Sequence, residues 1–190
     1  MITIAIDGST KSTGVAIFDD KELIKYECIT SNNKNVLTRI KYMTDEIEKI
    51  YLSYKNIDFQ KDLTKAIITD EEIKPFEIQV IMEQIIPDNL KDVTWSKNQA
   101  TFKALFYLQA AIVLMFHHYN IDVEFYGAST WRSKCGIRQG GLTRDTLKLK
   151  DKEFVQDTYS ISVNDDIADA ICIGHAKVNT KPEPQPFNWG

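Results

Sequence analysis

The chain has 190 residues, of which 43% are hydrophobic, so it is long and apolar enough for a globular domain with a buried core and is not a disordered chain. Its net charge of −4 is unusual for a nucleic-acid-binding protein, although such binding depends on where the charges lie. The three cysteines, Cys28, Cys135 and Cys172, are widely spaced, which argues against a disulfide framework or a zinc knuckle and suits a reducing cytosol.

The first part of the chain predicts a three-stranded meander followed by a helix. An apolar run from Ile2 stops at Asp7, and the turn-forming residues 8–12 follow it. Residues 13–18 and 23–30 have the composition of two further strands. Apolar residues then recur every three to four positions after Asn35 and up to Tyr54, which predicts an amphipathic helix.

The remainder alternates between strands and helices. Residues 55–77 are polar and irregular and are interpreted as a surface excursion, and residues 86–97 as a loop. Strands are predicted over residues 78–82, which lead into Glu83, and over residues 121–126. Helices are predicted over residues 98–119, after a cap at Ser129, over residues 143–159, and from a cap at Asn164 to about residue 178.

This order of elements predicts an α/β fold with a mixed five-stranded sheet and helices on both faces. We interpret residues 1–180 as one domain and residues 181–190, which hold three prolines, as an extended or mobile tail. The chain opens without a signal-type segment, and its longest apolar run, residues 110–116, is too short to cross a bilayer. We therefore expect a soluble, cytoplasmic protein.

Two of the predicted strands end on an acidic residue. Asp7 and Glu83 each follow an apolar run, where a charge is costly unless it has a partner or a functional role. Each also has a simpler interpretation, because aspartate before glycine is common in turns and a glutamate can lie exposed at a strand edge. Position alone does not separate these alternatives.

The start of the last predicted helix carries a third acidic group. Asp166 and Asp169 are three residues apart and share one face of the helix, and Asp165 is a second neighbour of Asp169. A helix N-terminus favours acidic residues, which accounts for Asp165 and Asp166. It does not account for Asp169, one turn further in among small and apolar residues, where a cation would relieve the repulsion between like charges.

Several carboxylates without a thiolate pair indicate a hard cation with oxygen ligands. Mg²⁺ is the natural candidate, and Mn²⁺ is its usual substitute. Two such ions about 4 Å apart can activate a water molecule and stabilise the leaving oxygen of a phosphodiester. The acidic residues therefore predict a Mg²⁺ or Mn²⁺ site, and phosphodiester hydrolysis is one reaction that such a site can support.

Three segments together resemble the RuvC family of the RNase H-like superfamily. Residues 6–9 (IDGS) with residues 13–16 (TGVA) are similar to the opening of that family, and residues 80–84 (VIMEQ) to its second acidic motif. Residues 166–170 (DIADA) are similar to its closing Asp-x-x-Asp-Ala motif. The segments follow the order of the family and span nearly the whole chain.

This resemblance implies an RNase H-like fold and a homodimer that cleaves Holliday junctions with Mg²⁺, in recombination or phage DNA processing. It implies that Asp7, Glu83, Asp166 and Asp169 are the catalytic and metal-binding residues, with Asp7 in contact with both ions. The chain has Gly8-Ser9 where Pro-Gly is usual, and its segments 55–77 and 86–97 are long. These departures resemble a divergent, phage-type branch, which would place the protein in a bacterial or phage-infected cell.

Basic residues are concentrated just before the last acidic motif. From Ser129 to Glu153 there are seven basic and three acidic residues, a local balance of +4, and phosphate contacts need such a surface. A solvated helix face explains residues 148–152 equally well, whereas the arginines near the glycines suit a flexible basic loop. The predicted DNA contacts are Ser9, Lys11, Arg132, Lys134, Arg138, Arg144 and Lys148.

Other interpretations of the same residues remain open. The aromatic residues of segment 95–107 suit either base stacking or contacts within the core or a dimer. A sugar kinase or another actin-like ATPase would need a second lobe, for which the chain is too short. A non-catalytic nucleic-acid-binding module with an RNase H-like fold, and a nuclease for RNA–DNA hybrids, are the alternatives to a nuclease for branched DNA.

Overall fold

The structure, a computed structural model, describes residues 1–69, 77–85 and 95–180, which form one five-stranded sheet with helices around it. The strands are β1 (Ile2–Asp7), β2 (Ser12–Asp19), β3 (Glu22–Thr30), β4 (Ile78–Glu83) and β5 (Val123–Tyr126). Their order is β3-β2-β1-β4-β5, in which β1, β2 and β3 form an antiparallel meander and β4 and β5 run parallel to β1. The predicted mixed five-stranded sheet is confirmed.

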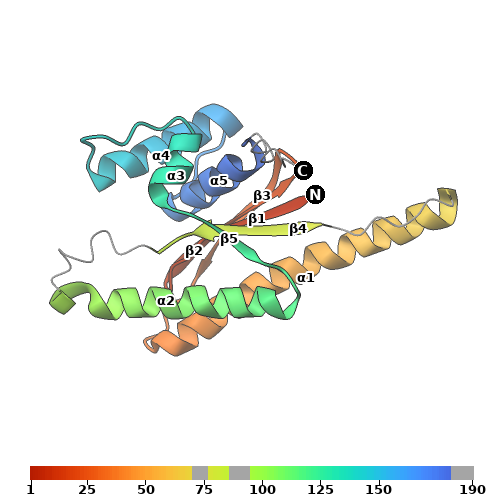
Figure 1. Cartoon of the computed structure of the whole chain (residues 1–190), viewed down its shortest axis with the longest axis horizontal. Coiled ribbons are helices and arrows are strands. Elements are labelled where there is room, and N and C mark those ends of the chain that lie inside the picture. The colour runs from red at the N-terminus through yellow and green to blue at the C-terminus, as the bar shows by residue number, and fades with distance from the viewer. Residues whose placement is uncertain (70–76, 86–94, 181–190) are drawn as a thin grey trace, which may run out of the picture.

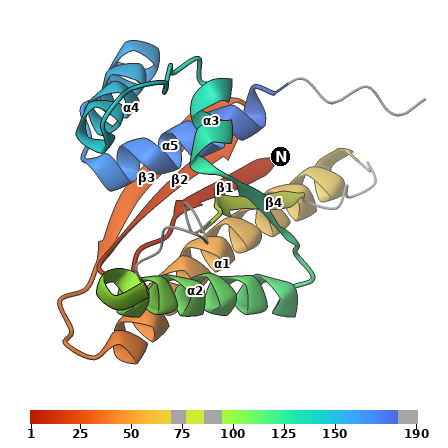
Figure 2. The ribbon, with the colours of Figure 1, turned by 60° about the vertical axis from the view of Figure 1, so that its left-hand side comes forward.

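Helices cover both faces of this sheet, as predicted. They are α1 (Val36–Thr69), α2 (Trp95–His118), α3 (Ala128–Lys134), α4 (Arg144–Tyr159) and α5 (Asp165–Val178). Figure 1 shows α1 and α2 on one face, and α3, α4 and α5 on the other. In Figure 2, α5 lies directly against the sheet and α4 lies on the outer side of α5.

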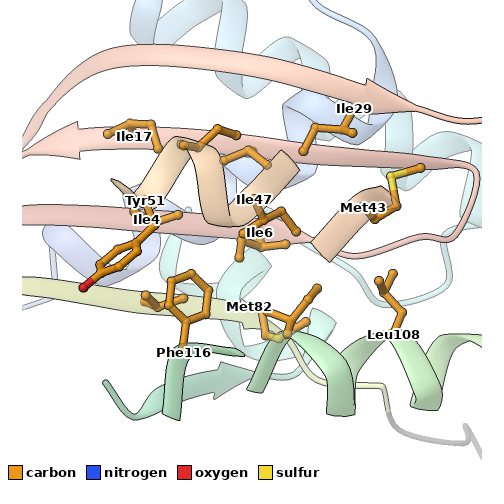
Figure 3. Packing of buried hydrophobic residues seen from close by; sticks show 14 of the residues in the cluster. Ile4, Ile6, Ile17, Ile29, Met43, Ile47, Tyr51, Met82, Leu108 and Phe116 are labelled. Carbon is orange, nitrogen blue, oxygen red and sulfur yellow. The ribbon is translucent and has the colours of Figure 1, made fainter. Parts of the chain in front are cut away.

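Side chains alternate between the two faces along each strand, because successive residues of a strand point to opposite sides. Ile4 and Ile6 of β1 and Met82 of β4 pack in the core under α1 and α2 (Figure 3). Ala5 and Ile81, one position away, pack in a second core with α3, α4 and α5. The odd-numbered residues of β1 and β4 therefore face α3 and α5.

Two glycines allow α5 to lie close to the sheet. A Cβ atom on Gly174 would lie 2.2 Å from Cε2 of Phe18, and a Cβ atom on Gly14 would lie 1.9 Å from the main-chain oxygen of Asp166. A side chain at Gly14 would require β2 and α5 to move apart, and a side chain at Gly174 would require at least the buried Phe18 ring to move. The N-terminal turn of α5, with its acidic motif, is thus held directly against β2.

The boundaries of some elements differ from the sequence prediction. Part of segment 55–77, expected to be irregular, is helical, because α1 continues to Thr69 and the chain has no glycine or proline between Val36 and Thr69 to end it. Helix α2 starts at Trp95, inside the predicted loop. Ser129 does not cap α3, because the N-cap position is Gly127, which has no side chain to accept a hydrogen bond from the first turn. Residues 70–76, 86–94 and 181–190 lie outside the described residues, so the predicted loop and tail there stay predictions.

Candidate metal centre

Asp7 and Glu83 end neighbouring strands on the same side of the sheet. β1 and β4 are parallel, with Ile6 opposite Met82, so the two carboxylates follow at the same edge. Both residues are odd-numbered, and the alternation along each strand therefore turns them toward α3 and α5. The alternation of side chains along each strand therefore determines the face of the sheet on which its terminal acidic residue lies.

Asp169 joins this pair from the second turn of α5. Asn164 caps the helix, since its side chain accepts a hydrogen bond of 2.9 Å from the main-chain N–H of Ile167. Asp169 faces the sheet and is only 3% exposed. Within the part of the chain that the structure describes, Asp7, Glu83 and Asp169 each offer a ligand atom, and these atoms lie within 4.8 Å of one another.

Burial and mutual repulsion make ionisation of this acidic group unfavourable. Burial, followed by the charges of Asp169 and Glu83, raises the pKa of Asp7 well above its ordinary value. Burial likewise raises the pKa of Asp169 to about 7 and outweighs the opposing effect of Lys148. Burial also raises the pKa of Glu83, against a hydrogen bond from Trp131 that lowers it. The three carboxylates therefore need a cation to be fully ionised together near neutral pH.

The geometry of the group fits a divalent cation with oxygen ligands. Oδ1 of Asp169 is buried and has no hydrogen-bond partner among the described residues, which is a costly state for a carboxylate oxygen. Two oxygens bound to one Mg²⁺ at about 2.1 Å lie up to about 4.2 Å apart, so only a small contraction would bring the three acids to one ion. The residues present thus suit Mg²⁺ or Mn²⁺, with Asp7, Glu83 and Asp169 as ligands.

Lys148 of α4 lies inside this acidic group. Its ammonium donates to Oδ2 of Asp169, and both side chains are largely buried. Burial alone would lower the pKa of Lys148, but the charges of Asp169, Asp7 and Glu83 outweigh burial and raise it. Lys148 was predicted to contact DNA; in the structure it supplies positive charge next to Asp169.

The two aspartates at the start of α5 point in different directions. Asp166 accepts a short hydrogen bond from the hydroxyl of Ser12, and its charge helps to raise the pKa of Asp7, so it lies at the rim of the group. Asp165 forms an ion pair of 2.8 Å with Lys152 of α4, and the hydrogen bond in this pair lowers its pKa. The structure thus brings three of the four predicted acids together and places Asp166 beside them.

The predicted DNA contacts separate into buried and exposed residues. Arg132 is only 9% exposed and forms three hydrogen bonds of 2.9–3.1 Å with the buried Asp151, so the expectation of a flexible basic loop is wrong for this residue. Arg132 and Trp131 are the buried residues of the short helix α3, and the hydrogen bonds to Asp151 fix the Arg132 side chain. Lys134 also lies on α3 but is exposed, and its ammonium donates to Oγ1 of Thr180 at 2.9 Å.

The other predicted contacts lie at the surface or next to Asp7. Arg138 is exposed between α3 and α4, and Arg144 is exposed in the first turn of α4. Lys11 is exposed in the turn after β1. Ser9, in the same turn, is half-buried, and Thr13 donates a hydrogen bond of 2.6 Å to its main-chain oxygen.

Sequence reasoning missed two residues that contact the predicted acids. The indole of Trp131 on α3 donates a hydrogen bond of 3.1 Å to Oε2 of Glu83. The hydroxyl of Ser12 on β2 donates to Asp166. Both pairs join residues far apart in the sequence, so no local pattern could have revealed them.

The fold is similar to that of RuvC. No protein-family model matches the chain, and no curated protein matches it in sequence. The structure of T. thermophilus RuvC in complex with a Holliday junction substrate superposes with a TM-score of 0.57 at 11% identity, over 93% of this chain and 92% of that chain. A second Thermus thermophilus RuvC structure superposes with a TM-score of 0.55 at 12% identity, over the same shares of both chains. At such low identity the likeness shows the fold alone, which is the RNase H-like fold in its RuvC-type form.

Proposed function

We propose that the chain is a metal-dependent endonuclease that cleaves phosphodiester bonds in branched DNA, with four-way Holliday junctions as its main substrate. The observation that carries this proposal is the grouping of Asp7, Glu83 and Asp169, with a buried carboxylate oxygen that lacks a partner among the described residues. The RuvC-type fold supports it, because T. thermophilus RuvC has a similar fold and its structure is known in complex with a Holliday junction substrate.

In this proposal the residues of the centre bind the metal ion or provide charge for the substrate. Asp7, Glu83 and Asp169 hold the metal, and Asp166 contributes from the rim. Bound Mg²⁺, in one or two ions, would supply an activated water molecule and stabilise the leaving oxygen. Lys148 keeps a positive charge beside Asp169, where the phosphate of the substrate would bring negative charge.

The exposed basic residues suit the path of the DNA backbone away from this centre. Arg144 lies one helical turn before Lys148 on α4, so a basic row leads from the acidic group to the surface. Arg138 lies in the preceding loop, and Lys11 in the turn after β1. We assign phosphate contacts to these residues and to Lys134, and Ser9 remains a candidate from its position near Asp7.

A homodimer formed through α2 belongs to the same proposal. One side of α2 packs in the core through Leu108, Ile112 and Phe116. The other side carries Tyr107 and Leu114, which are 56% and 67% exposed, in a helix whose segment Gln99–His118 is apolar and long enough by composition to cross a membrane. Because the inner side of the helix is part of the core, we assign the outer side to a second copy of the chain, whose two-fold symmetry would match that of a junction.

The test is a comparison of substrates with and without metal. The purified chain is incubated with a four-way DNA junction, a linear duplex of the same sequence and an RNA–DNA hybrid, in Mg²⁺, Mn²⁺ or EDTA. We expect cleavage of the junction in Mg²⁺ and Mn²⁺, little cleavage of the other two substrates, and none in EDTA. Binding of the junction without cleavage in either metal would instead favour a non-catalytic module.

A further inference from the structure

Trp131 is a fully buried residue whose one polar atom is directed at the acidic group. It lies on α3 with 0% exposure, and its Nε1–H donates to Oε2 of Glu83 at 3.1 Å. Glu83 ends β4, and α3 covers this face of the sheet, so the contact joins two separate elements of the fold.

The indole is itself held in place from its other side. The guanidinium of Arg132 lies 4.2 Å from the centre of the Trp131 ring. Arg132 is fixed in turn by Asp151, which is 0% exposed and accepts hydrogen bonds of 3.1, 3.1 and 2.9 Å from it. A chain of contacts thus runs from α4 through α3 to the carboxylate of Glu83.

The chemistry of an indole suits the support of a metal ligand. An indole N–H only donates, so it can hold one carboxylate oxygen of Glu83 without itself acting as a ligand of the cation. It is also neutral, and it therefore leaves the negative charge of the group intact. Lys148 differs in this respect, because its positive charge on Asp169 opposes the binding of a second cation nearby.

We infer that Trp131 is a positioning residue that holds the Glu83 carboxylate ready for the metal ion, with Arg132 and Asp151 fixing the indole. This inference rests on the proposed function. A glutamate side chain has several rotatable bonds, and a fixed donor on one oxygen reduces the freedom that metal binding would otherwise remove. The other oxygen of the carboxylate is left to serve as the ligand atom.

The first experiment measures metal affinity without DNA. Titration calorimetry with Mn²⁺ compares the wild-type chain with Trp131→Phe, which keeps an aromatic ring in the core but removes the N–H donor. We expect about tenfold weaker binding, the usual effect of removing a hydrogen-bond partner of a metal ligand. Glu83→Gln and the double variant complete a thermodynamic cycle, in which Trp131→Phe has no further effect once Glu83 is replaced.

The second experiment keeps Trp131 in place. Trp95 and Trp189 are replaced by phenylalanine, so that Trp131 is the only tryptophan of the chain. We expect Mg²⁺ to change its fluorescence with the dissociation constant that calorimetry gives for Mg²⁺, and Glu83→Gln to abolish the change. This readout remains available even if Trp131→Phe fails to fold.

The outcomes separate this inference from the proposed function. If the wild-type chain binds no metal, or Glu83→Gln leaves the affinity unchanged, the metal centre itself is contradicted. If Glu83→Gln weakens binding but Trp131→Phe does not, only the role of Trp131 is overturned. An equal effect of Trp131→Phe with and without Glu83 would show a general structural role and also overturn the inference.

Discussion

Three partly or fully buried carboxylates gathered between the sheet and α5 repel one another, and they lower their free energy by binding protons or a cation. Lys148 partly compensates Asp169, yet the pKa of Asp169 still lies at about 7 because burial dominates. Oδ1 of the same residue has no hydrogen-bond partner among residues 1–69, 77–85 and 95–180, so compensation within this part of the chain is incomplete. At the residue scale, repulsion between the carboxylates and the buried Oδ1 of Asp169 together favour a bound metal ion.

The raised pKa of Asp169 predicts how metal and pH act on stability. Its pKa rises from 3.8 to about 7, so between these values the folded chain holds a proton that the unfolded chain has lost. This contribution to stability is therefore present at low pH and is lost as the pH rises toward 7. Mg²⁺ stabilises the ionised carboxylates, so we expect it to raise the Tm more at about pH 8 than at about pH 5.5.

Thermal unfolding with Mg²⁺ or EDTA at both pH values measures this effect. Asp169→Asn should remove most of the difference between the Mg²⁺-induced Tm shifts at the two pH values. Asp157→Asn, at an exposed position on α4, should retain this difference. An equal shift in Tm at both pH values would count against the assigned ionisation.

The neighbouring aspartates of α5 provide a matched pair of variants. Asp165 is paired with Lys152 away from the centre, and an exposed ion pair of this kind contributes little to stability. We expect Asp165→Asn to cleave junctions like the wild type, and Asp166→Asn to bind Mn²⁺ about 10- to 100-fold more weakly and to cleave poorly. Cleavage rates and calorimetry check this. A larger loss of cleavage and Mn²⁺ affinity for Asp165→Asn than for Asp166→Asn would show that Asp165, and not Asp166, belongs to the metal centre.

At the scale of elements, the site depends on how closely α5 lies against the sheet. Sequence patterns predicted the strands that end at Asp7 and Glu83 and the cap of α5 at Asn164, because each follows from local alternation or local hydrogen bonding. They did not predict the helical part of segment 55–69 or the burial of Arg132, which depend on packing between distant elements. For the same reason the sequence did not predict the role of Trp131, because its partner, Glu83, lies 48 residues away in the chain.

A methyl group at Gly14 should displace the acidic motif. The Cβ atom of Gly14→Ala would lie 1.9 Å from the main-chain oxygen of Asp166, so β2 and α5 must separate. We expect a loss of about 1–3 kcal/mol in the free energy of unfolding, typical of overpacking, and weaker metal binding. Gly140→Ala is the control, because a Cβ atom there meets nothing within 4 Å. Chemical denaturation measures both, and equal stabilities would refute the close approach.

At the scale of the whole molecule, the net charge of −4 conceals an uneven distribution. Arg132 and Lys148 are neutralised by Asp151 and Asp169 inside the fold, so they contribute less to an external basic surface than the sequence suggested. Arg138, in the loop before α4, and Arg144, in the first turn of α4, remain exposed. The proposed dimer would place two such surfaces about one two-fold axis.

The exposed side of α2 tests the proposed dimer. We expect Leu114→Glu to shift the wild-type chain from dimer to monomer, because it places a charge in an apolar contact. Leu149→Glu on α4 is the control, since Leu149 is similarly exposed, at 54%, but lies on the opposite face of the sheet. Light scattering after gel filtration gives the mass. A wild-type monomer at all concentrations, or a Leu114→Glu dimer, would contradict this interface.

The central claim is that Asp169 belongs to a metal centre that cleaves branched DNA. The most direct measurement is single-turnover cleavage of a four-way junction in Mg²⁺ by the wild type and Asp169→Asn, with junction binding measured in parallel. We expect cleavage by the wild type, no detectable cleavage by the variant, and nearly equal binding and folding for both. Undiminished cleavage by Asp169→Asn would contradict the claim, and so would a wild-type chain that binds the junction but leaves it uncut.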